Sequence, residues 1–316
     1  MKKTVLIVVV LAALLAATVG AASANGGPHG GYTPTTDACA GCHRTHTASG
    51  ARLLIDTSTY ALCMSCHGSA GTGADTNVAD GFFLSTRSES THGTANTANN
   101  APLLGGGFSY YEGAATTSTH DVTNSVTYAW GTGTAGRGEA ALLAGGAALN
   151  CASCHDPHGS SNYRILRDTV NGIPVAVAQV DEGAAKDYDT EQWGAGTSSF
   201  CAACHDAYHQ TAAGQGSILD DGSYTHRIDM NWAYGGNVNP EIVGLAGSYL
   251  PLSQSSTLGL VVCMTCHLPH GTSAQMTGIA DGGPLGTGNI PGDTTATDSA
   301  LLRLDNRAVC EVCHQK

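Results

Sequence analysis

The chain has 316 residues, of which 42% are hydrophobic but only 6% aromatic and 12% charged. Its formal net charge of -12 excludes a protein that binds nucleic-acid phosphates through a basic surface. Its 42 glycines lack the three-residue period of collagen, which excludes that fold as well. Because so few aromatic side chains would struggle to fill a large core, we expect a bound group to supply part of the interior.

The first residues predict an export signal. The pair Lys2-Lys3 precedes an apolar run over 5–19, and Ala22-Ser23-Ala24 follows that run. A basic start, an apolar stretch and an Ala-x-Ala cleavage site are the layout of a secretory signal peptide, whereas a retained membrane anchor would need a longer run. We expect residues 1–24 to be removed and residues 25–316 to form one exported domain, extracellular or on the cell surface, with the periplasm as the alternative.

Regular elements are expected to be few and short. Residues 68–150 are rich in Gly, Thr, Ala and Asn, and we expect them to wrap around the rest of the protein rather than form a domain. Helices are predicted over 138–149 and 306–314, the second capped by Asp305, and strands over 175–180 and 258–262. Gly-Gly, Asp-Gly and Gly-Thr clusters elsewhere indicate irregular coil.

All twelve cysteines fall in Cys-x-x-Cys pairs, and a histidine follows each pair directly. The pairs are Cys39/Cys42, Cys63/Cys66, Cys151/Cys154, Cys201/Cys204, Cys263/Cys266 and Cys310/Cys313, followed by His43, His67, His155, His205, His267 and His314. This string attaches c-type haem, because two thioethers reach the porphyrin vinyl groups while the adjacent imidazole, the proximal ligand, binds the iron. Disulfides or zinc ribbons would not place a histidine after every second cysteine.

The sequence therefore predicts a multihaem c-type cytochrome with six haem c groups, in which irregular coil wraps round a haem chain. The attachment strings are unevenly spaced, so no short polypeptide repeat is expected. Porphyrins bonded at two thioethers and two axial nitrogens would supply the flat apolar mass that aromatic residues otherwise provide, and we expect the apoprotein to be unfolded.

The second axial position of each iron separates a catalyst from an electron carrier, because a catalytic haem keeps that position open. Eight histidines remain to fill it. The predicted distal ligands are His46, His158 and His270, each three residues beyond a proximal histidine, and the loop histidines His92, His120 and His226. His29 and His209 are reserves, and an exposed surface histidine is the alternative for every candidate.

A histidine three residues past a proximal ligand is too close to reach the far face of its own haem, but it can reach a neighbouring one. Two porphyrins would then lie in near contact. With histidine on both sides of every iron, the protein would have no catalytic residue and would transfer electrons.

Three functions fit this pattern. The first is a filament subunit that conducts electrons to an extracellular acceptor, the second a monomeric periplasmic or surface shuttle. The third is a reductase of nitrogen oxides or sulfur compounds, which would need at least one five-coordinate haem.

Acidic clusters also offer a weak calcium prediction. They are Asp181-Glu182, Asp187-Tyr188-Asp189 and Asp220-Asp221, and none has the full EF-hand pattern. Solvated loop charge is the alternative, and with the haem propionates it would attract cations or metal-ion acceptors.

The chain resembles the outer-surface hexahaem cytochromes of the outer-membrane cytochrome S and E type, which polymerise into extracellular nanowires. The likeness lies in the export signal, the six strings, the sparse regular structure and the arm His29-Gly-Gly followed by Cys-Ala-Gly-Cys-His-Arg-Thr-His. It covers the motifs and not the loops between them.

This resemblance implies that His46 binds a haem of the adjacent subunit, the one attached through Cys263, Cys266 and His267. It also implies a homopolymer of identical subunits as partners, with upstream cytochromes as donors and an acceptor such as a metal oxide.

Overall fold

The computed structural model describes residues 29–30, 32, 37–71, 74, 76–83, 102–126, 128–130, 139–141, 148–180, 193–209, 225–231, 250–253, 259–276, 299–306 and 308–313. The expected export signal, His92, His314 and the three acidic clusters of the calcium prediction lie outside these residues. Within the described part, no helix has both the length and the apolar character needed to cross a membrane.

Helices in the described residues are short, and several coincide with attachment strings. They are η1 (Ala38–Gly41), η2 (Ala51–Leu53), α2 (Thr59–His67), α3 (Cys151–Cys154), η3 (Tyr163–Ile165), α4 (Thr197–Ala202), η4 (Asp206–Tyr208), α6 (Cys263–Cys266) and α7 (Ala308–Cys313). The hydroxyl of Ser58 caps α2 by accepting from the Ala61 N–H at 3.1 Å. Asn150 caps α3 in the same way through Ala152.

Strands pair only as two-stranded antiparallel ladders in the described residues. These are β1 (Thr76–Asn77) with β2 (Phe82–Phe83), β3 (Tyr110–Tyr111) with β4 (Ala114–Ala115), β5 (Ser118–Thr119) with β12 (Gly271–Thr272), β6 (Tyr128–Trp130) with β7 (Glu139–Ala141), β8 (Thr169–Val170) with β9 (Ile173–Pro174), and β10 (Met230–Asn231) with β11 (Leu260–Val261). The β5/β12 ladder joins distant parts of the sequence, and it ends beside His120 and His270.

The helix expected over 306–314 is confirmed by α7, and the Ala308 N–H at its start donates to the main-chain carbonyl of Asp305 at 3.0 Å. The Asp305 carboxylate accepts from the Gln275 N–H at 2.8 Å. The helix expected over 138–149 is wrong where the structure describes it, because 139–141 form β7. Pairing with β6 gives this alanine-rich segment backbone partners that an isolated short helix would hardly hold in water.

The strand expected over 258–262 contains β11, whereas 175–180 form no ladder. Buried Asn162 takes the place of a partner strand there: its side-chain oxygen accepts from the Val177 N–H at 2.8 Å and its amide donates to the Val175 carbonyl at 3.1 Å. A side chain has therefore satisfied backbone groups that the alternating pattern assigned to a sheet.

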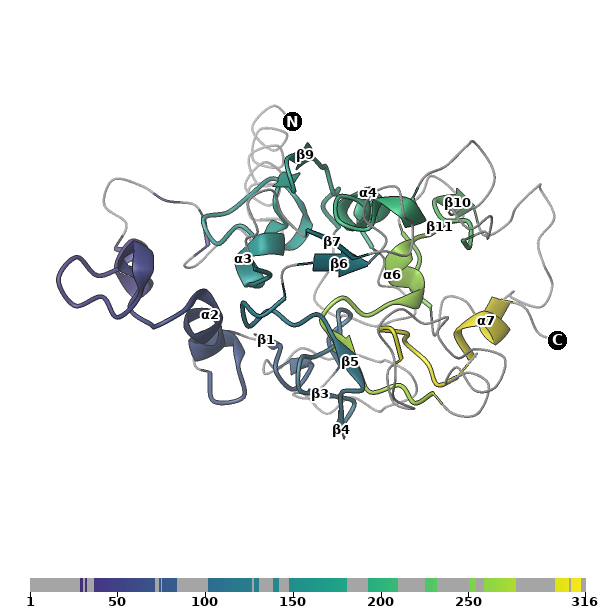
Figure 1. Ribbon diagram of the computed structural model, residues 1–316, viewed down its shortest axis with the longest axis horizontal. Helices are drawn as coiled ribbons and strands as arrows, with labels where there is room; N and C mark the ends of the chain where they lie inside the picture. The colour runs from purple at the N-terminus through teal and green to yellow at the C-terminus, as the bar shows by residue number, and fades with distance from the viewer. Residues whose placement is uncertain are drawn as a thin grey trace, which may run out of the picture.

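The core is divided into small clusters rather than one large interior. The largest contains Leu104, Tyr163, Val177, Val180, Trp193, Val262 and Met264. A second one, around Val122 and Leu149, packs against Cys151 and Cys204. Along the long axis α2 lies toward one end and α7 toward the other, with α3, α4 and α6 between them (Figure 1). The structure is mostly coil with short elements, as the sequence predicts.

Candidate haem centres

Each attachment string that the structure describes in full is a single helical turn. The N–H of the histidine donates to the carbonyl of the first cysteine, at 2.8 Å in His43, 3.0 Å in His155, 2.9 Å in His205 and 3.1 Å in His267. Residues three apart share one face of a helix, so this turn presents both thiols of a string on one side with the histidine beside them.

Four of these histidines face another histidine ring. The separations between ring centres are 6.1 Å for His67 and His29, 6.2 Å for His43 and His158, 6.2 Å for His205 and His120, and 6.3 Å for His155 and His270. An imidazole nitrogen binds a first-row metal at about 2.0 Å, so rings on opposite sides of one ion have centres about 6 Å apart. Each pair therefore fits a single iron held between its rings.

Hydrogen bonds at Nδ1 turn the other ring nitrogen, Nε2, toward the gap. Three proximal histidines donate from Nδ1 to a main-chain carbonyl: His43 to Arg52 at 3.0 Å, His155 to Arg164 at 3.0 Å, and His267 to Ala300 at 2.9 Å. Two of the histidines that face them do the same: His29 Nδ1 donates to the Pro157 carbonyl at 3.0 Å, and His120 Nδ1 donates to the Pro269 carbonyl at 2.6 Å. Such bonds fix the tautomer and orientation of a ligating imidazole.

Burial keeps the inner rings neutral. Desolvation lowers the pKa of His120, His155, His267 and His270, and that of His270 falls to about 3. A neutral imidazole retains the lone pair that a metal requires. The ring of His270 also packs against Phe108, with ring centres 4.8 Å apart.

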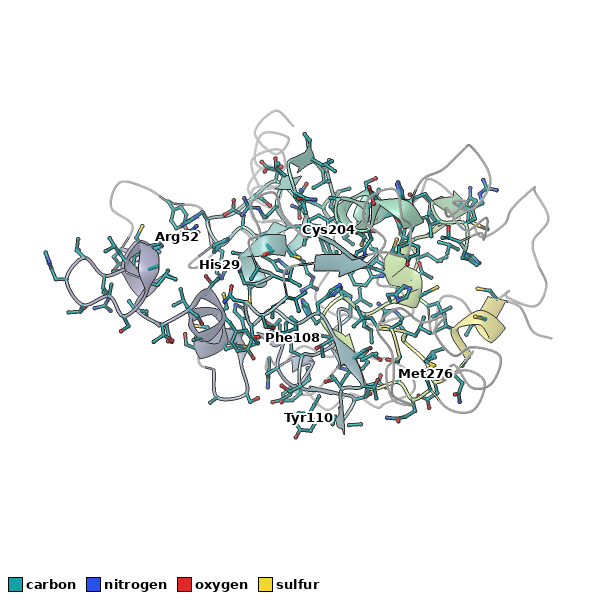
Figure 2. The ribbon with its side chains drawn as sticks, viewed as in Figure 1. His29, Arg52, Phe108, Tyr110, Cys204 and Met276 are labelled. Atoms are coloured by element: carbon teal, nitrogen blue, oxygen red, sulfur yellow. The ribbon has the colours of Figure 1, made fainter. Side chains whose placement is uncertain are left out.

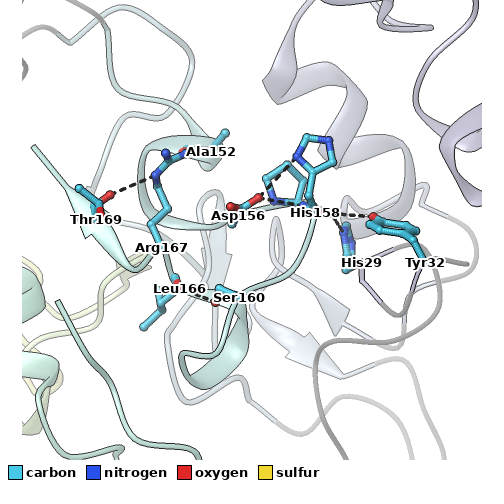
Figure 3. A network of polar contacts seen from close by, with 10 residues as sticks. His29, Tyr32, Ala152, Asp156, His158, Ser160, Leu166, Arg167 and Thr169 are labelled. Atoms are coloured by element: carbon cyan, nitrogen blue, oxygen red, sulfur yellow. Dashed lines mark hydrogen bonds and ion pairs between the residues drawn. The ribbon is translucent and has the colours of Figure 1, made fainter. Parts of the chain in front are cut away.

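The loop after the third attachment string serves the first two haem sites at once. His158 in this loop faces His43, and the Pro157 carbonyl accepts from His29 Nδ1 and, at 3.4 Å, from the Tyr32 hydroxyl (Figure 3). The Asp156 carboxylate accepts from the His158 N–H at 2.9 Å. His29 thereby lies between α2 and α3, whereas Cys204 lies nearer the middle of the molecule (Figure 2).

Consecutive strings are also neighbours in space. Cys63 is hydrogen-bonded to Cys151, and Cys201 to Cys263. Burial and then the charge of Cys204 raise the pKa of Cys154 to about 12, and burial and then Cys313 raise that of Cys266 to about 12. Cys42 likewise interacts with Cys63 and Cys66. The attachment sites therefore follow one another in sequence order, from the first to the sixth.

The remaining histidine candidates have different surroundings. His46 is exposed. His226 Nδ1 donates to the Arg227 carbonyl at 2.7 Å, and the Nε2 atom of His209 is 2.8 Å from the Asp229 carboxylate, which occupies the nitrogen that the other sites leave for iron. Among described residues, none of the facing pairs includes His267. Of the two reserves, the structure thus brings His29 to a proximal histidine and turns His209 to a carboxylate.

The first, third and fifth strings share a hydrogen-bonded frame. The frame residues are 52–54, 164–166 and 300–302, and each begins with two residues at positive φ: Arg52/Leu53, Arg164/Ile165 and Ala300/Leu301. In each copy the first residue accepts from the proximal Nδ1, and the second accepts from the N–H after the proximal histidine at 2.7–2.8 Å. Each copy also forms an isolated bridge between the proximal histidine and the third residue.

A module of two attachment strings therefore recurs three times, which spacing alone did not reveal. Each module has a leading histidine (His29, His120, His226), an odd-numbered string with an offset histidine three residues after it (His46, His158, His270), and an even-numbered string. The frame begins nine residues after His43 and His155 but 33 after His267. Arg-Leu-Leu and Arg-Ile-Leu were the available signal, and the insertion in the third module hid it.

Comparison with known proteins gives one family match. The doubled CXXCH motif matches residues 33–72 and 143–173, which contain the first three strings. No curated protein and no solved structure matches. Paired CXXCH motifs indicate a multihaem c-type cytochrome, a haem-binding electron-transfer protein.

Proposed function

We propose that this protein conducts electrons through six haems with histidine on both sides of each iron, as a subunit of an extracellular filament. Export rests on the predicted signal at residues 1–24, and the acceptor would be a metal oxide or another extracellular oxidant. Upstream cytochromes at the cell surface or in the periplasm would supply the electrons.

The observation that carries the proposal is the set of four facing histidine pairs. Covalent haem supplies the change of iron oxidation state when it is bound. The chain's own contribution would be to hold each iron between neutral imidazoles, four of which (His29, His43, His120 and His155) have Nδ1 fixed on a main-chain carbonyl, and to exclude small molecules from the metal. A ligand set that stays unchanged between oxidation states suits transfer rather than substrate binding.

The order of the attachment sites supports a continuous path. Because each attachment site lies beside the next, from the first to the sixth, an electron can move between neighbouring porphyrins without crossing a long stretch of polypeptide. An entry near α2 and an exit near α7, at opposite ends of the long axis, suit end-to-end joining (Figure 1).

The offset histidines support joining through His46. His158, after the third string, faces the first proximal histidine, and His270, after the fifth string, faces the third. In each case the histidine faces the odd-numbered string that precedes its own. No odd-numbered string precedes the first within the chain, so the equivalent site for His46 is the fifth string of another copy. There His267 would receive the exposed His46 of the neighbour as its distal ligand.

Replacing His46 by Ala tests this function. We expect six haems per chain but no filaments in electron micrographs, with one iron per chain newly able to bind carbon monoxide. His209→Ala is the matched control, since its ring is held by Asp229, and should leave filaments intact. Filaments of normal length from the His46 variant would contradict the proposal.

A monomeric shuttle and a reductase predict other results. A shuttle needs a distal ligand for His267 from its own chain, so every preparation would remain monomeric and closed to carbon monoxide. A reductase would keep the fifth iron open, and wild-type protein would show a high-spin absorption band together with turnover of a nitrogen oxide or sulfur compound.

A further inference from the structure

The leading histidines follow a rule in the two modules where their contacts are described. His29 of the first module donates to Pro157, which lies in the second module directly before the offset histidine His158. His120 of the second module donates to Pro269, which lies in the third module directly before the offset histidine His270. Each leading histidine is thus held by the main chain of the next module.

One loop in the next module therefore performs two tasks. Its offset histidine faces an odd-numbered proximal histidine of the previous module, while the carbonyl just before it orients the leading histidine that faces an even-numbered one. His158 with Pro157 does this for the first module, and His270 with Pro269 for the second. Because the offset histidine and the carbonyl belong to adjacent residues, a loop that places the offset histidine at one site also places the carbonyl beside the leading histidine of the other.

In the first module, Thr45 occupies the position of these prolines, directly before His46. Both residues are exposed. In the third module, the leading histidine His226 donates instead to the carbonyl of its own neighbour, Arg227, at 2.7 Å. This local bond differs from the inter-module bonds of His29 and His120.

Contacts between cysteines independently indicate that the end of the third module corresponds to the start of the first module of another copy. The first cysteine of an even-numbered string touches the first cysteine of the next string, in Cys63 with Cys151 and in Cys201 with Cys263. By this rule Cys310 should meet Cys39 of another copy. Cys310 and Cys39 are exposed, whereas the four cysteines that contact each other within the chain are half-buried. A third exposed cysteine, Cys66, lies inside the first module.

We propose that the junction between two copies of this chain repeats the junction between its modules, so that the Thr45 carbonyl of one copy accepts from His226 Nδ1 of the adjoining copy. His226 would exchange its bond to Arg227 for this one and serve as distal ligand of the sixth haem. A single contact with the neighbour thereby completes the fifth site through His46 and orients the ligand of the sixth. The inference rests on the proposed filament.

A cryo-microscopy map of the holoprotein filament tests the inference directly. We expect His226 Nδ1 within hydrogen-bond distance of Thr45 O across the junction, as for His29 and Pro157 within one chain. If His46 binds the fifth iron but His226 keeps Arg227, the inference is overturned and the filament stands. If His46 binds no neighbouring haem, the proposed function falls, and the inference with it.

Substitutions give a second readout. Because the acceptor is a main-chain carbonyl, Thr45→Pro should give filaments and six haems per chain, as the modules with Pro157 and Pro269 do. Pro269→Thr is the reciprocal control and should leave the absorption and magnetic-resonance signals of the fourth haem unchanged. Loss of assembly in Thr45→Pro with full haem content would overturn the inference, since the two loops would then not be equivalent.

Discussion

The loops after the first and fifth attachment strings have the same plan but opposite surroundings. His270 is packed by Phe108 and faces His155, in a place where burial lowers its pKa to about 3. His46 has the same offset from its proximal histidine and is exposed. The packing of an offset histidine therefore depends on the neighbouring module: the same spacing gives a buried histidine in one loop and an exposed one in the other.

The largest expected effect is the loss of His270. His270→Ala should open the third iron and destabilise the protein by about 3 kcal/mol or more, because a buried ring is removed from between Phe108 and the haem site. Carbon monoxide titration should count one open iron per chain, and thermal unfolding should shift far more than in His46→Ala.

If the alanine variant fails to load haem, His270→Met offers a second measurement. A thioether can occupy the position and would raise the potential of that haem. An unchanged set of six potentials in the methionine variant would show that His270 is not a ligand.

The next effect concerns the backbone beside His270. Gly106 has φ +82°, and a Cβ there would lie 2.0 Å from the Gly271 carbonyl oxygen. Gly106→Ala should cost about 3–4 kcal/mol in the free energy of unfolding, from strain and steric overlap together. Gly113→Ala is the matched control, because Gly113 has the same φ and nothing within 4 Å. It should cost only about 1 kcal/mol, and equal losses would contradict the argument.

A smaller effect is expected at Asn162, which corresponds by position to Gly50 of the first module. Asn162→Gly would give the second module the residue of the first. It removes buried hydrogen bonds to Val175 and Val177, and we expect a loss of about 2–3 kcal/mol in chemical denaturation. Gly50→Asn cannot serve as the reverse test, since a Cβ at Gly50 would lie 2.2 Å from the Asp56 carbonyl oxygen.

The smallest effect compares the strained frames. Leu53 has φ +62° and is 49% exposed, so Leu53→Gly relieves strain at little cost in packing and should stabilise the protein by up to about 1 kcal/mol. Ile165 has φ +51° but is half-buried. Ile165→Gly should therefore destabilise, and a gain in both variants would show that packing does not distinguish the two frames.

The sequence predicts the attachment chemistry because that chemistry is local: a cysteine pair and its histidine lie within one helical turn. It also predicts that His158 and His270 must reach other haems, since neither can reach around its own. It could not predict which histidine meets which haem, because those pairs depend on how modules stack. The sequence offers His29 only as a reserve, because it lies in a glycine-rich arm, yet the Pro157 carbonyl holds it opposite His67.

The strand wrongly expected over 175–180 has a similar cause. Valines alternate there as in a ladder, but the segment bonds to the side chain of Asn162 and to separate main-chain groups at Asp168, Tyr163 and Ala195, which no pattern of hydrophobicity reveals. A helix is expected at the β7 segment, 139–141, because alanine favours one, but pairing with β6 overrides that preference.

The proposed ligation of each odd-numbered site by a histidine from a later string has a consequence for maturation. If the chain is exported amino end first, its first string is exposed early, whereas His158, the second ligand proposed for that string, emerges only with the third. Each odd-numbered iron would therefore stay reactive toward gases and peroxide until two further strings had crossed. In the proposed filament, the fifth iron would lose this reactivity only when another folded molecule bound.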